Sequence, residues 1–347
     1  MNSTADTLRI DTETAPGRIR TSIWPGLLLT ALIAIAALGL GRLWPLVGGP
    51  VFGLVLGIAV RNLRAPGADL QPGIRVAGKQ VLQWSIVALG LNLSLTQVLR
   101  TGASSLEVTA VTITAAFVSA ALLGRMLGIP PKLKLLIGIG TAICGGSAIA
   151  AATPIVRPDE HETAFAISTI FLFNLVAVLT FPALGHLMGL SPRGFGLWAG
   201  TAINDTSSVV AAGYTYGKAA GDFATIVKLT RATLIVPVCL VLAFLEMRRH
   251  RKHASSDFSL RRIFPWFIVW FVAASALRST GLIPDSWTPA IHDVAGFMII
   301  MALTAIGLSS DLRRMAATGV RPILLGLGVW AAVAFSSLGV QLLMGQL

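Results

Sequence analysis

The stretch Gly140-Thr141-Ala142-Ile143-Cys144-Gly145-Gly146-Ser147 recurs sixty residues later as Gly200-Thr201-Ala202-Ile203-Asn204-Asp205-Thr206-Ser207-Ser208. Extended to Ala151-Ala152 and Ala211-Ala212, the two copies share seven identical residues in one register. Both copies are small, polar and glycine-rich, and both interrupt an apolar segment. Unpaired peptide groups are costly in hydrocarbon, so a membrane helix opens its backbone only where the opening is used. The two GTAI segments therefore predict opened helices at the binding site of a transporter.

Composition places the chain among multi-pass membrane proteins. Hydrophobic residues make up 54% of its 347 residues and charged residues only 12%, and apolar runs of about 20 residues recur along it. The net charge of +12 is expected to orient the protein in lipid rather than to bind nucleic acid, because the basic residues lie mostly between apolar runs. We expect a disordered cytoplasmic tail over residues 1–22 and one transmembrane domain over residues 23–347. Cys144 and Cys239 are expected to be free thiols.

Apolar runs bounded by charge, proline or glycine predict the spans. Nine are expected, at residues 23–44, 47–62, 79–98, 104–127, 164–188, 222–246, 263–281, 290–309 and 322–346. With the two GTAI segments, at 133–157 and 194–217, they make eleven hydrophobic segments. The sequence thus predicts an all-α polytopic membrane protein. Each GTAI segment could cross the membrane as a broken helix or fold back as a re-entrant hairpin.

A second repeat favours the hairpins. Ala88-Leu89-Gly90-Leu91-Asn92-Leu93-Ser94-Leu95 is echoed by Ala305-Ile306-Gly307-Leu308-Ser309-Ser310-Asp311-Leu312, and both copies end an apolar span with polar residues. Two hairpins make the related spans antiparallel in both repeats, whereas two crossings leave the spans after the GTAI segments parallel. We therefore expect inverted structural repeats of the secondary-transporter type, with repeat 1 at about 47–188 and a permuted repeat 2 at about 194–347.

Basic residues predict the orientation in the membrane. Loops that lie inside when the N-terminus is inside receive Arg61, Arg64, Arg75, Lys79, Arg125, Lys132, Lys134, Arg248, Arg249, Arg251, Lys252, Arg261, Arg262, Arg313, Arg314 and Arg321. The opposite loops receive single residues such as Arg42, Arg100 and Arg278. We therefore expect a cytoplasmic N-terminus, because cytoplasmic loops carry the excess of lysine and arginine.

The candidate binding site lies at the two openings. Glycine permits unwinding, and the freed amides and hydroxyls can hold a ligand. Helices that begin near Ser147 and Ser207 would direct positive N-terminal ends at an anion. The alternative is that these small residues only allow close helix packing. The candidate substrate-binding residues are Thr141, Cys144, Gly145, Gly146, Ser147, Asn204, Asp205, Thr206, Ser207, Ser208, Lys228 and Arg231.

Three charged residues within apolar segments carry the strongest functional signal. Lys228 and Arg231 share one helix face, and charges at membrane depth face the protein interior or water and mark pathways. They could instead snorkel to the outer headgroups, since Asp222 lies only about two turns earlier, or pair with Asp205. Asp205 could itself carry a proton or coordinate sodium as a coupling ion.

Enzymatic and metal-dependent functions are not expected. Ser147 has no histidine and acid spaced to activate it, and the chain has no nucleotide-binding loop, so transport would be secondary. His161, His250 and His253 lie in charged loops without the spacing of a metal site. The polar residues Asn92 and Ser94 are expected to end spans as caps or at the water interface. We expect no cofactor beyond a coupling Na+ or H+.

The ordered motifs resemble those of the YeiH-type, UPF0324-like sulfate exporter family. They are "GTAICGGSAIAAATPIV", "GTAINDTSSVVAAG" and "ATIVKLTRATLIVP", with "LGLNLSL" before them and "IGLSSDL" after them. The resemblance implies a multi-pass protein of a bacterial inner membrane, related to the bile acid, arsenite and riboflavin transporters. It also implies a midplane anion site built from both GTAI segments, with Lys228 and Arg231 as the anion's partners. The chain departs from relatives that often pair a histidine with an acid where it has Asn204-Asp205.

Three functions remain open from the sequence. The first is a secondary transporter that exports a small anion such as sulfate or a related sulfur oxyanion. The second is a sodium or proton antiporter centred on Asp205, and the third is a membrane sensor without transport. The expected partners are the small anion and the lipid bilayer, with a homodimer left open and no nucleic acid.

Overall fold

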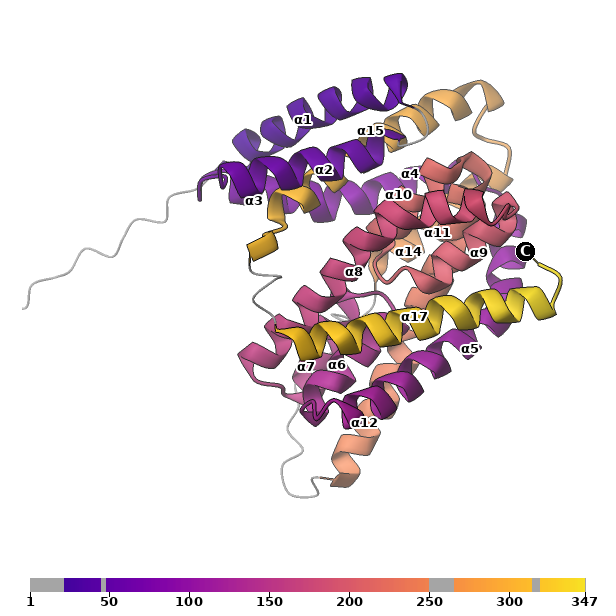
Figure 1. The fold of residues 1–347 in the computed structure, drawn as a ribbon. Coiled ribbons are helices and arrows are strands. Elements are labelled where there is room, and N and C mark those ends of the chain that lie inside the picture. The colour runs from indigo at the N-terminus through magenta and orange to yellow at the C-terminus, as the bar shows by residue number, and fades with distance from the viewer. Residues whose placement is uncertain (1–21, 45–47, 250–264, 314–318, 347) are drawn as a thin grey trace, which may run out of the picture.

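The chain folds into a bundle of helices (Figure 1). The computed structural model describes residues 22–44, 48–249, 265–313 and 319–346, and every regular element in these ranges is helical. All but the last residue of the tail predicted at residues 1–22, and most of the basic loop between α12 and α14, lie outside the described residues. The helices are α1 (Trp24–Leu43), α2 (Gly48–Leu63), α3 (Gln71–Val76), η1 (Ala77–Val81), α4 (Leu82–Gly90), α5 (Leu95–Met126), α6 (Pro131–Ala142), α7 (Gly146–Val156), α8 (Glu160–Leu187), α9 (Pro192–Ala202), α10 (Thr206–Tyr216), α11 (Lys218–Thr233), α12 (Ile235–Arg249), α14 (Trp266–Ser279), η2 (Asp285–Trp287), α15 (Thr288–Ser309) and α17 (Val320–Leu343).

Membrane-length helices confirm the predicted fold class. Within the described residues, six helical segments are long and apolar enough to cross a membrane. They are Trp24–Leu43, Leu95–Met126, Glu160–Leu187, Lys218–Leu245, Asp285–Ser309 and Val320–Leu343. Shorter apolar helices, α2 and α14 among them, run beside these. Both GTAI segments lie in broken helices, as the sequence predicts.

One predicted pair of spans is displaced along the chain. The sequence predicts spans at 79–98 and 104–127, whereas the helices run continuously from Gln71 to Gly90 and from Leu95 to Met126. Hydropathy misses the first turns of the first helix, residues 71–78, because they carry Arg75 and lead to Lys79. The turn between the two helices consists of residues 91–94, which the sequence includes in the first predicted span. Ser94 accepts a hydrogen bond from the Gln97 amide as the N-cap of α5. The expected capping role of Ser94 is therefore confirmed.

Both GTAI segments fold back as hairpins, the alternative that the second repeat favours. Hairpin 1 consists of α6 and α7, and Lys132 at its start donates to the carbonyl of Arg157 at its end, at 2.7 Å. Hairpin 2 consists of α9 and α10. Its last residue, Tyr216, stacks on Phe195 of the first turn with ring centroids 3.9 Å apart. The two arms of each hairpin therefore begin and end on the same side of the bundle.

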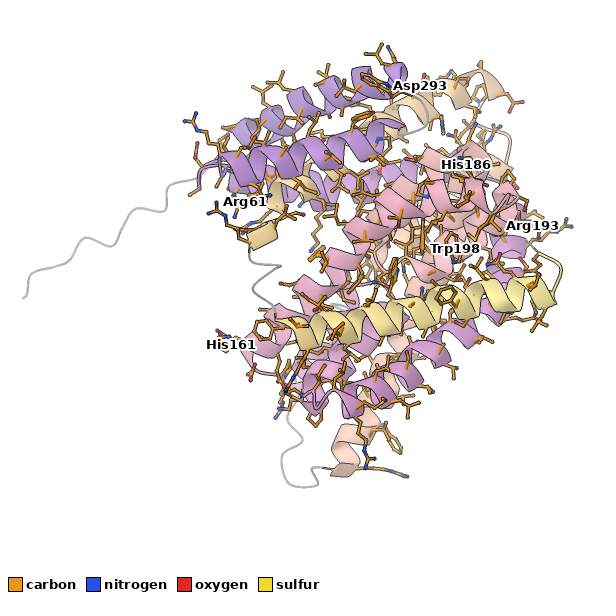
Figure 2. All side chains as sticks on the ribbon, viewed as in Figure 1. Arg61, His161, His186, Arg193, Trp198 and Asp293 are labelled. Carbon is orange, nitrogen blue, oxygen red and sulfur yellow. The ribbon has the colours of Figure 1, made fainter. Side chains whose placement is uncertain are left out.

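The hairpins enter from opposite ends of the bundle. Arg61 and His161 lie at one end, whereas His186, Arg193 and Asp293 lie at the other (Figure 2). Hairpin 1 precedes the start of α8, near His161, and hairpin 2 follows its end, near His186. We call the two ends the Arg61 end and the Arg193 end.

Helix packing brings the two halves of the chain together. The continuous helix formed by η1 and α4 packs antiparallel to α15, because Gly78 of η1 approaches Ala305 while Leu89 of α4 and His292 line the same cavity. Helix α2 packs along α15, α14 along α4, and α17 along α5. Around the hairpins, α6 contacts α8, and α9 contacts α11. The exact division into two permuted repeats stays a prediction.

Candidate functional site

Each hairpin reverses through a short break in its helix. In hairpin 1 the break spans residues 143–145, and Gly145 has φ of +68° and ψ of −132°. This conformation favours glycine, because a Cβ would clash with the backbone. In hairpin 2 the break spans residues 203–205, and Asp205 is the N-cap of α10. The predicted openings therefore lie where the sequence places them.

Two buried cations cap the broken ends of α6 and α9. The ammonium of Lys228 donates to the carbonyls of Ile143 at 2.7 Å and Ile203 at 2.9 Å. Arg231 donates through Nε to Ala142 at 2.6 Å, through Nη2 to Thr141 at 2.7 Å, and through Nη1 to Thr201. Both side chains are 0% exposed. They thus satisfy carbonyls from both hairpins that the breaks leave without helical partners.

The buried positions of Lys228 and Arg231 exclude the alternative that these side chains snorkel to the headgroups. The structure also shows no ion pair between either of them and Asp205 among the described residues. Lys228 and Arg231 are fully buried, and neither takes part in an ion pair recorded for the described residues. Lysine carries three donors and arginine five. The five bonds to carbonyls leave further N–H groups on both side chains available to a ligand.

The tips of the two hairpins touch each other. A Cβ built on Gly145 would lie 3.5 Å from the Cβ of Asp205 and 3.3 Å from Ile170 on α8. One turn further along α8, Asn174 Oδ1 accepts a hydrogen bond from the Asp205 amide at 3.1 Å. Asn174 lies near the middle of the 28-residue helix α8, about 20 Å from each end. The tips therefore meet near the middle of the membrane.

Several buried polar atoms at the tips have no hydrogen-bond partner among the residues that the structure describes. They are Oγ1 of Thr141, Nδ2 of Asn174, and both amide atoms of Asn204. These three residues are at most 3% exposed. A buried polar group without a partner costs free energy and calls for an explanation. A ligand held at the tips would supply the missing partners.

The remaining candidates have unequal environments. Thr206, Ser207 and Ser208 form the first turn of α10 and are buried. Ser207 donates to Oδ2 of Asp205 through both its amide and its hydroxyl. In hairpin 1, Cys144 is buried, whereas Gly146 is half-buried and Ser147 is exposed. The structure therefore places all twelve predicted residues at the hairpin tips or on the helix that caps them.

Asn174 was not among the predicted residues. It stands in the apolar run Phe171-Leu172-Phe173-Asn174-Leu175, and its bond to the Asp205 amide crosses between helices far apart in the sequence. The available signal was a lone amide in the centre of an apolar span, because polar groups at that depth are costly and mark functional sites.

The contrast between Ser147 and Ser207 predicts thiol reactivity. Replacing Ser147 with cysteine should give a thiol that reacts with a maleimide much faster than a cysteine at Ser207, because Ser147 is exposed and Ser207 is 1% exposed. The native Cys144 and Cys239 are buried, so the unmodified protein supplies the background. Mass spectrometry of the labelled protein measures both rates. Equal rates at the two positions would contradict the arrangement of the tips.

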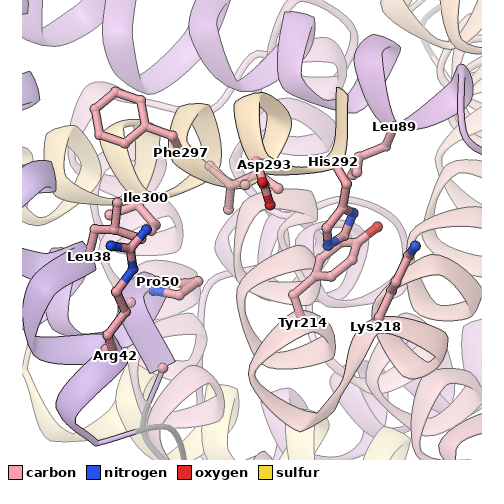
Figure 3. Close-up of a pocket in the computed structure, with 15 residues that line it drawn as sticks. Leu38, Arg42, Pro50, Leu89, Tyr214, Lys218, His292, Asp293, Phe297 and Ile300 are labelled. Carbon is pink, nitrogen blue, oxygen red and sulfur yellow. The ribbon is translucent and has the colours of Figure 1, made fainter. Parts of the chain in front are cut away.

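A cavity of about 400 Å³ opens at the Arg193 end, where Asp293 lines it (Figure 2 and Figure 3), and none of the twelve candidate residues is part of its lining. Charged and polar side chains line it, namely Arg42, Tyr214, Lys218, His292 and Asp293. The hydroxyl of Tyr214 donates to Oδ1 of Asp222 at 2.5 Å. The cavity lies between hairpin 2 with α11 on one side and helices α1, α2 and α15 on the other.

Metal-binding clusters of three or more histidine, cysteine, aspartate or glutamate side chains do not occur within the described ranges. The tips offer neutral amides, hydroxyls, one carboxylate and two cations. This set suits a small ion or a small polar solute rather than an organic cofactor.

Comparison with known proteins identifies relatives over nearly the whole chain. The family model described as Conserved hypothetical protein 698 matches residues 25–326. A UPF0324 membrane protein of Fusobacterium nucleatum is 41% identical over 340 residues, which cover 92% of this chain and 98% of the relative. UPF0324 membrane proteins of Clostridium tetani and Streptococcus pyogenes are 38% and 42% identical, and each alignment covers 92% of this chain and 97% of the relative.

One solved structure is also similar. The sodium proton antiporter MjNhaP1 from Methanocaldococcus jannaschii, solved at pH 8, is 15% identical. The alignment covers 89% of this chain and 97% of that chain, with a TM-score of 0.26. A TM-score this low does not establish a common fold.

Proposed function

The chain belongs to the Conserved hypothetical protein 698 family, with the UPF0324 membrane proteins as relatives, and we propose that it is a secondary transporter that exports a small anion. Its family membership agrees with the resemblance to YeiH-type exporters. That resemblance favours sulfate or a related sulfur oxyanion as the substrate. The anion binds where the two hairpin tips meet.

The excess of positive charge at the tips carries this proposal. A helix has about half a positive charge at its N-terminus and about half a negative charge at its C-terminus. The C-terminal ends of α6 and α9 therefore offset the N-terminal ends of α7 and α10. The side chains decide the balance, and the cations Lys228 and Arg231 outnumber the single carboxylate of Asp205. A site with this surplus, buried near the membrane centre, attracts an anion.

The distribution of basic residues supports a cytoplasmic Arg61 end. Arg61 pairs with Asp311 there, and Lys132 contacts Arg157 close to the start of α8. The Arg193 end has fewer basic residues, Arg42 and Arg278 among them. Because cytoplasmic loops carry the excess of lysine and arginine, we place the N-terminus in the cytoplasm and the protein in a bacterial inner membrane.

An antiporter centred on Asp205 is the second candidate. Asp205 is partly exposed at the tip, and a carboxylate in an opened membrane segment can exchange a proton or sodium. The same residue could couple anion export to a proton or to sodium. The two functions differ in what crosses the membrane, so flux measurements separate them.

Flux from proteoliposomes tests the proposal. Purified full-length protein should exchange labelled sulfate, sulfite or thiosulfate faster than protein-free vesicles, and the unlabelled anion should compete. Taurine and dicarboxylates extend the series to organic anions. Sodium-dependent proton movement in the same vesicles, without flux of any anion, would replace anion export by the antiporter. Absence of both fluxes from folded protein would leave the sensor function.

A further inference from the structure

The two hairpins differ in what caps their second helix. The shared register aligns Gly145 with Asp205, and Ser147 with Ser207. In hairpin 2 the Asp205 carboxylate caps α10 by accepting from Ser207. In hairpin 1 the corresponding residue, Gly145, is the N-cap of α7 and has no side chain that could accept from the first amides. Hairpin 2 thus has a carboxylate of its own at the start of its second helix, whereas hairpin 1 has no negatively charged group at the corresponding position.

Two side chains at the tip of hairpin 2, which contacts Gly145 of hairpin 1, have amide atoms without a partner among the described residues. Asn174 reaches the tip, because its Oδ1 accepts from the Asp205 amide at 3.1 Å, and the Nδ2 of the same planar amide has no partner. Asn174 is 3% exposed. Asn204, next to Asp205, is 1% exposed, and neither of its amide atoms has a partner. The tip thus presents buried N–H donors that no group in the described part of the chain satisfies.

We propose that the anion sits at the N-terminus of α7, in the position that the Asp205 carboxylate takes at α10, and that Asn174 is a binding residue that donates to it. The ligand class is a small oxyanion, whose oxygens accept from the first amides of α7 and from Nδ2 of Asn174. Lys228 and Arg231 hold the tips in place through the backbone carbonyls. This inference rests on the proposed anion transport and adds the place of the anion and a residue that binds it.

Asn174→Asp is the decisive variant. Aspartate keeps an oxygen that accepts from the Asp205 amide, but it replaces the Nδ2 donor with a negative charge. Affinity for the anion should fall by about 100-fold, as expected for a like charge a few ångströms away in a poorly solvated site. Thr169→Val is the matched control. Thr169 lies on the same helix and also has a buried hydroxyl without a partner among the described residues, but it packs against Gly326 of α17.

Binding is measured with labelled sulfate, and with sulfite and inorganic phosphate as competitors, on the full-length protein in detergent. The wild-type protein and the Thr169→Val variant should bind alike, and the Asn174→Asp variant should lose binding while it elutes as a folded monodisperse species. Cysteine at Ser147 gives a second readout, because bound anion should slow its reaction with a maleimide. Asn174→Ala, which adds no charge, should weaken binding less than Asn174→Asp.

The outcomes separate this inference from the proposed function. Wild-type anion flux together with unchanged anion affinity in the Asn174→Asp variant would overturn the inference alone. If the anion binds to the Ser147→Cys variant but does not change the rate at which its new thiol reacts with the maleimide, the placement of the anion at α7 would also be overturned. Absence of any anion flux or binding in the wild-type protein would instead overturn the proposed function.

Discussion

Replacing Arg231 with methionine is expected to destabilise the protein and to abolish transport. Arg231 donates to the carbonyls of Thr141, Ala142 and Thr201, which belong to both hairpins. Methionine leaves all three carbonyls without this donor in a buried site, and each such loss costs about 1–3 kcal/mol. The expected loss of stability is therefore about 3 kcal/mol or more. The tips should separate, and the binding site should be lost with them.

Lysine at the same position should rescue only part of this loss. A lysine ammonium is a single charged group, whereas the planar guanidinium donates in several fixed directions at once. Arg193→Met is the control for removing an arginine, because Arg193 is exposed at the start of α9 and lies over the ring of Phe223. Thermal unfolding in detergent and flux from proteoliposomes measure both properties. Normal stability and transport in the Arg231→Met variant would show that the capping bonds are dispensable.

The outline of the fold was predictable because membrane constraints act on local sequence. Lipid requires long apolar helices with internally satisfied backbones, so hydropathy alone finds most spans. The GTAI repeats mark the breaks, since glycine and small polar residues are the ones that tolerate an opened backbone. The start of the helix that ends at Gly90 was misplaced because Arg75 lies inside its first turns, in α3, rather than before the helix.

The partners of the buried charges were not predictable from the sequence. The spacing of Lys228 and Arg231 places them on one helix face, but it does not reveal that backbone carbonyls of two distant hairpins receive their bonds. Asp205 was the apparent ion partner by charge alone. The breaks in the two hairpins leave backbone carbonyls at the ends of α6 and α9 without helical partners, and these carbonyls accept the hydrogen bonds that a carboxylate could have accepted. The role of Asn174 required knowing that α8 passes both tips.

The Asp205→Asn variant separates the two proposed functions, because it should strengthen anion binding in an anion exporter but abolish proton movement in an antiporter. Asparagine caps a helix about as well as aspartate does, so α10 and the hydrogen bond from Ser207 should persist. An anion at the N-terminus of α7 would lie beside Asp205, because Gly145 and Asp205 are in contact. At about 6 Å and an effective dielectric constant of about 20, two like charges repel by about 3 kcal/mol.

Removal of the Asp205 charge should therefore tighten anion binding, by up to about 100-fold. The charges that remain around the position are Lys228 and Arg231 on α11, while α8 contributes the neutral Asn174. Sodium-dependent proton movement should instead be abolished in an antiporter, because the amide neither titrates nor balances a bound cation. Asp205→Ala serves as the control for the cap and should cost about 0.5–2 kcal/mol of stability. Binding of labelled sulfate measures the expected gain in anion affinity, and proton flux from the same preparations measures the expected loss of antiport. Weaker anion binding in the Asp205→Asn variant, with stability unchanged, would place the anion away from Asp205 and α7.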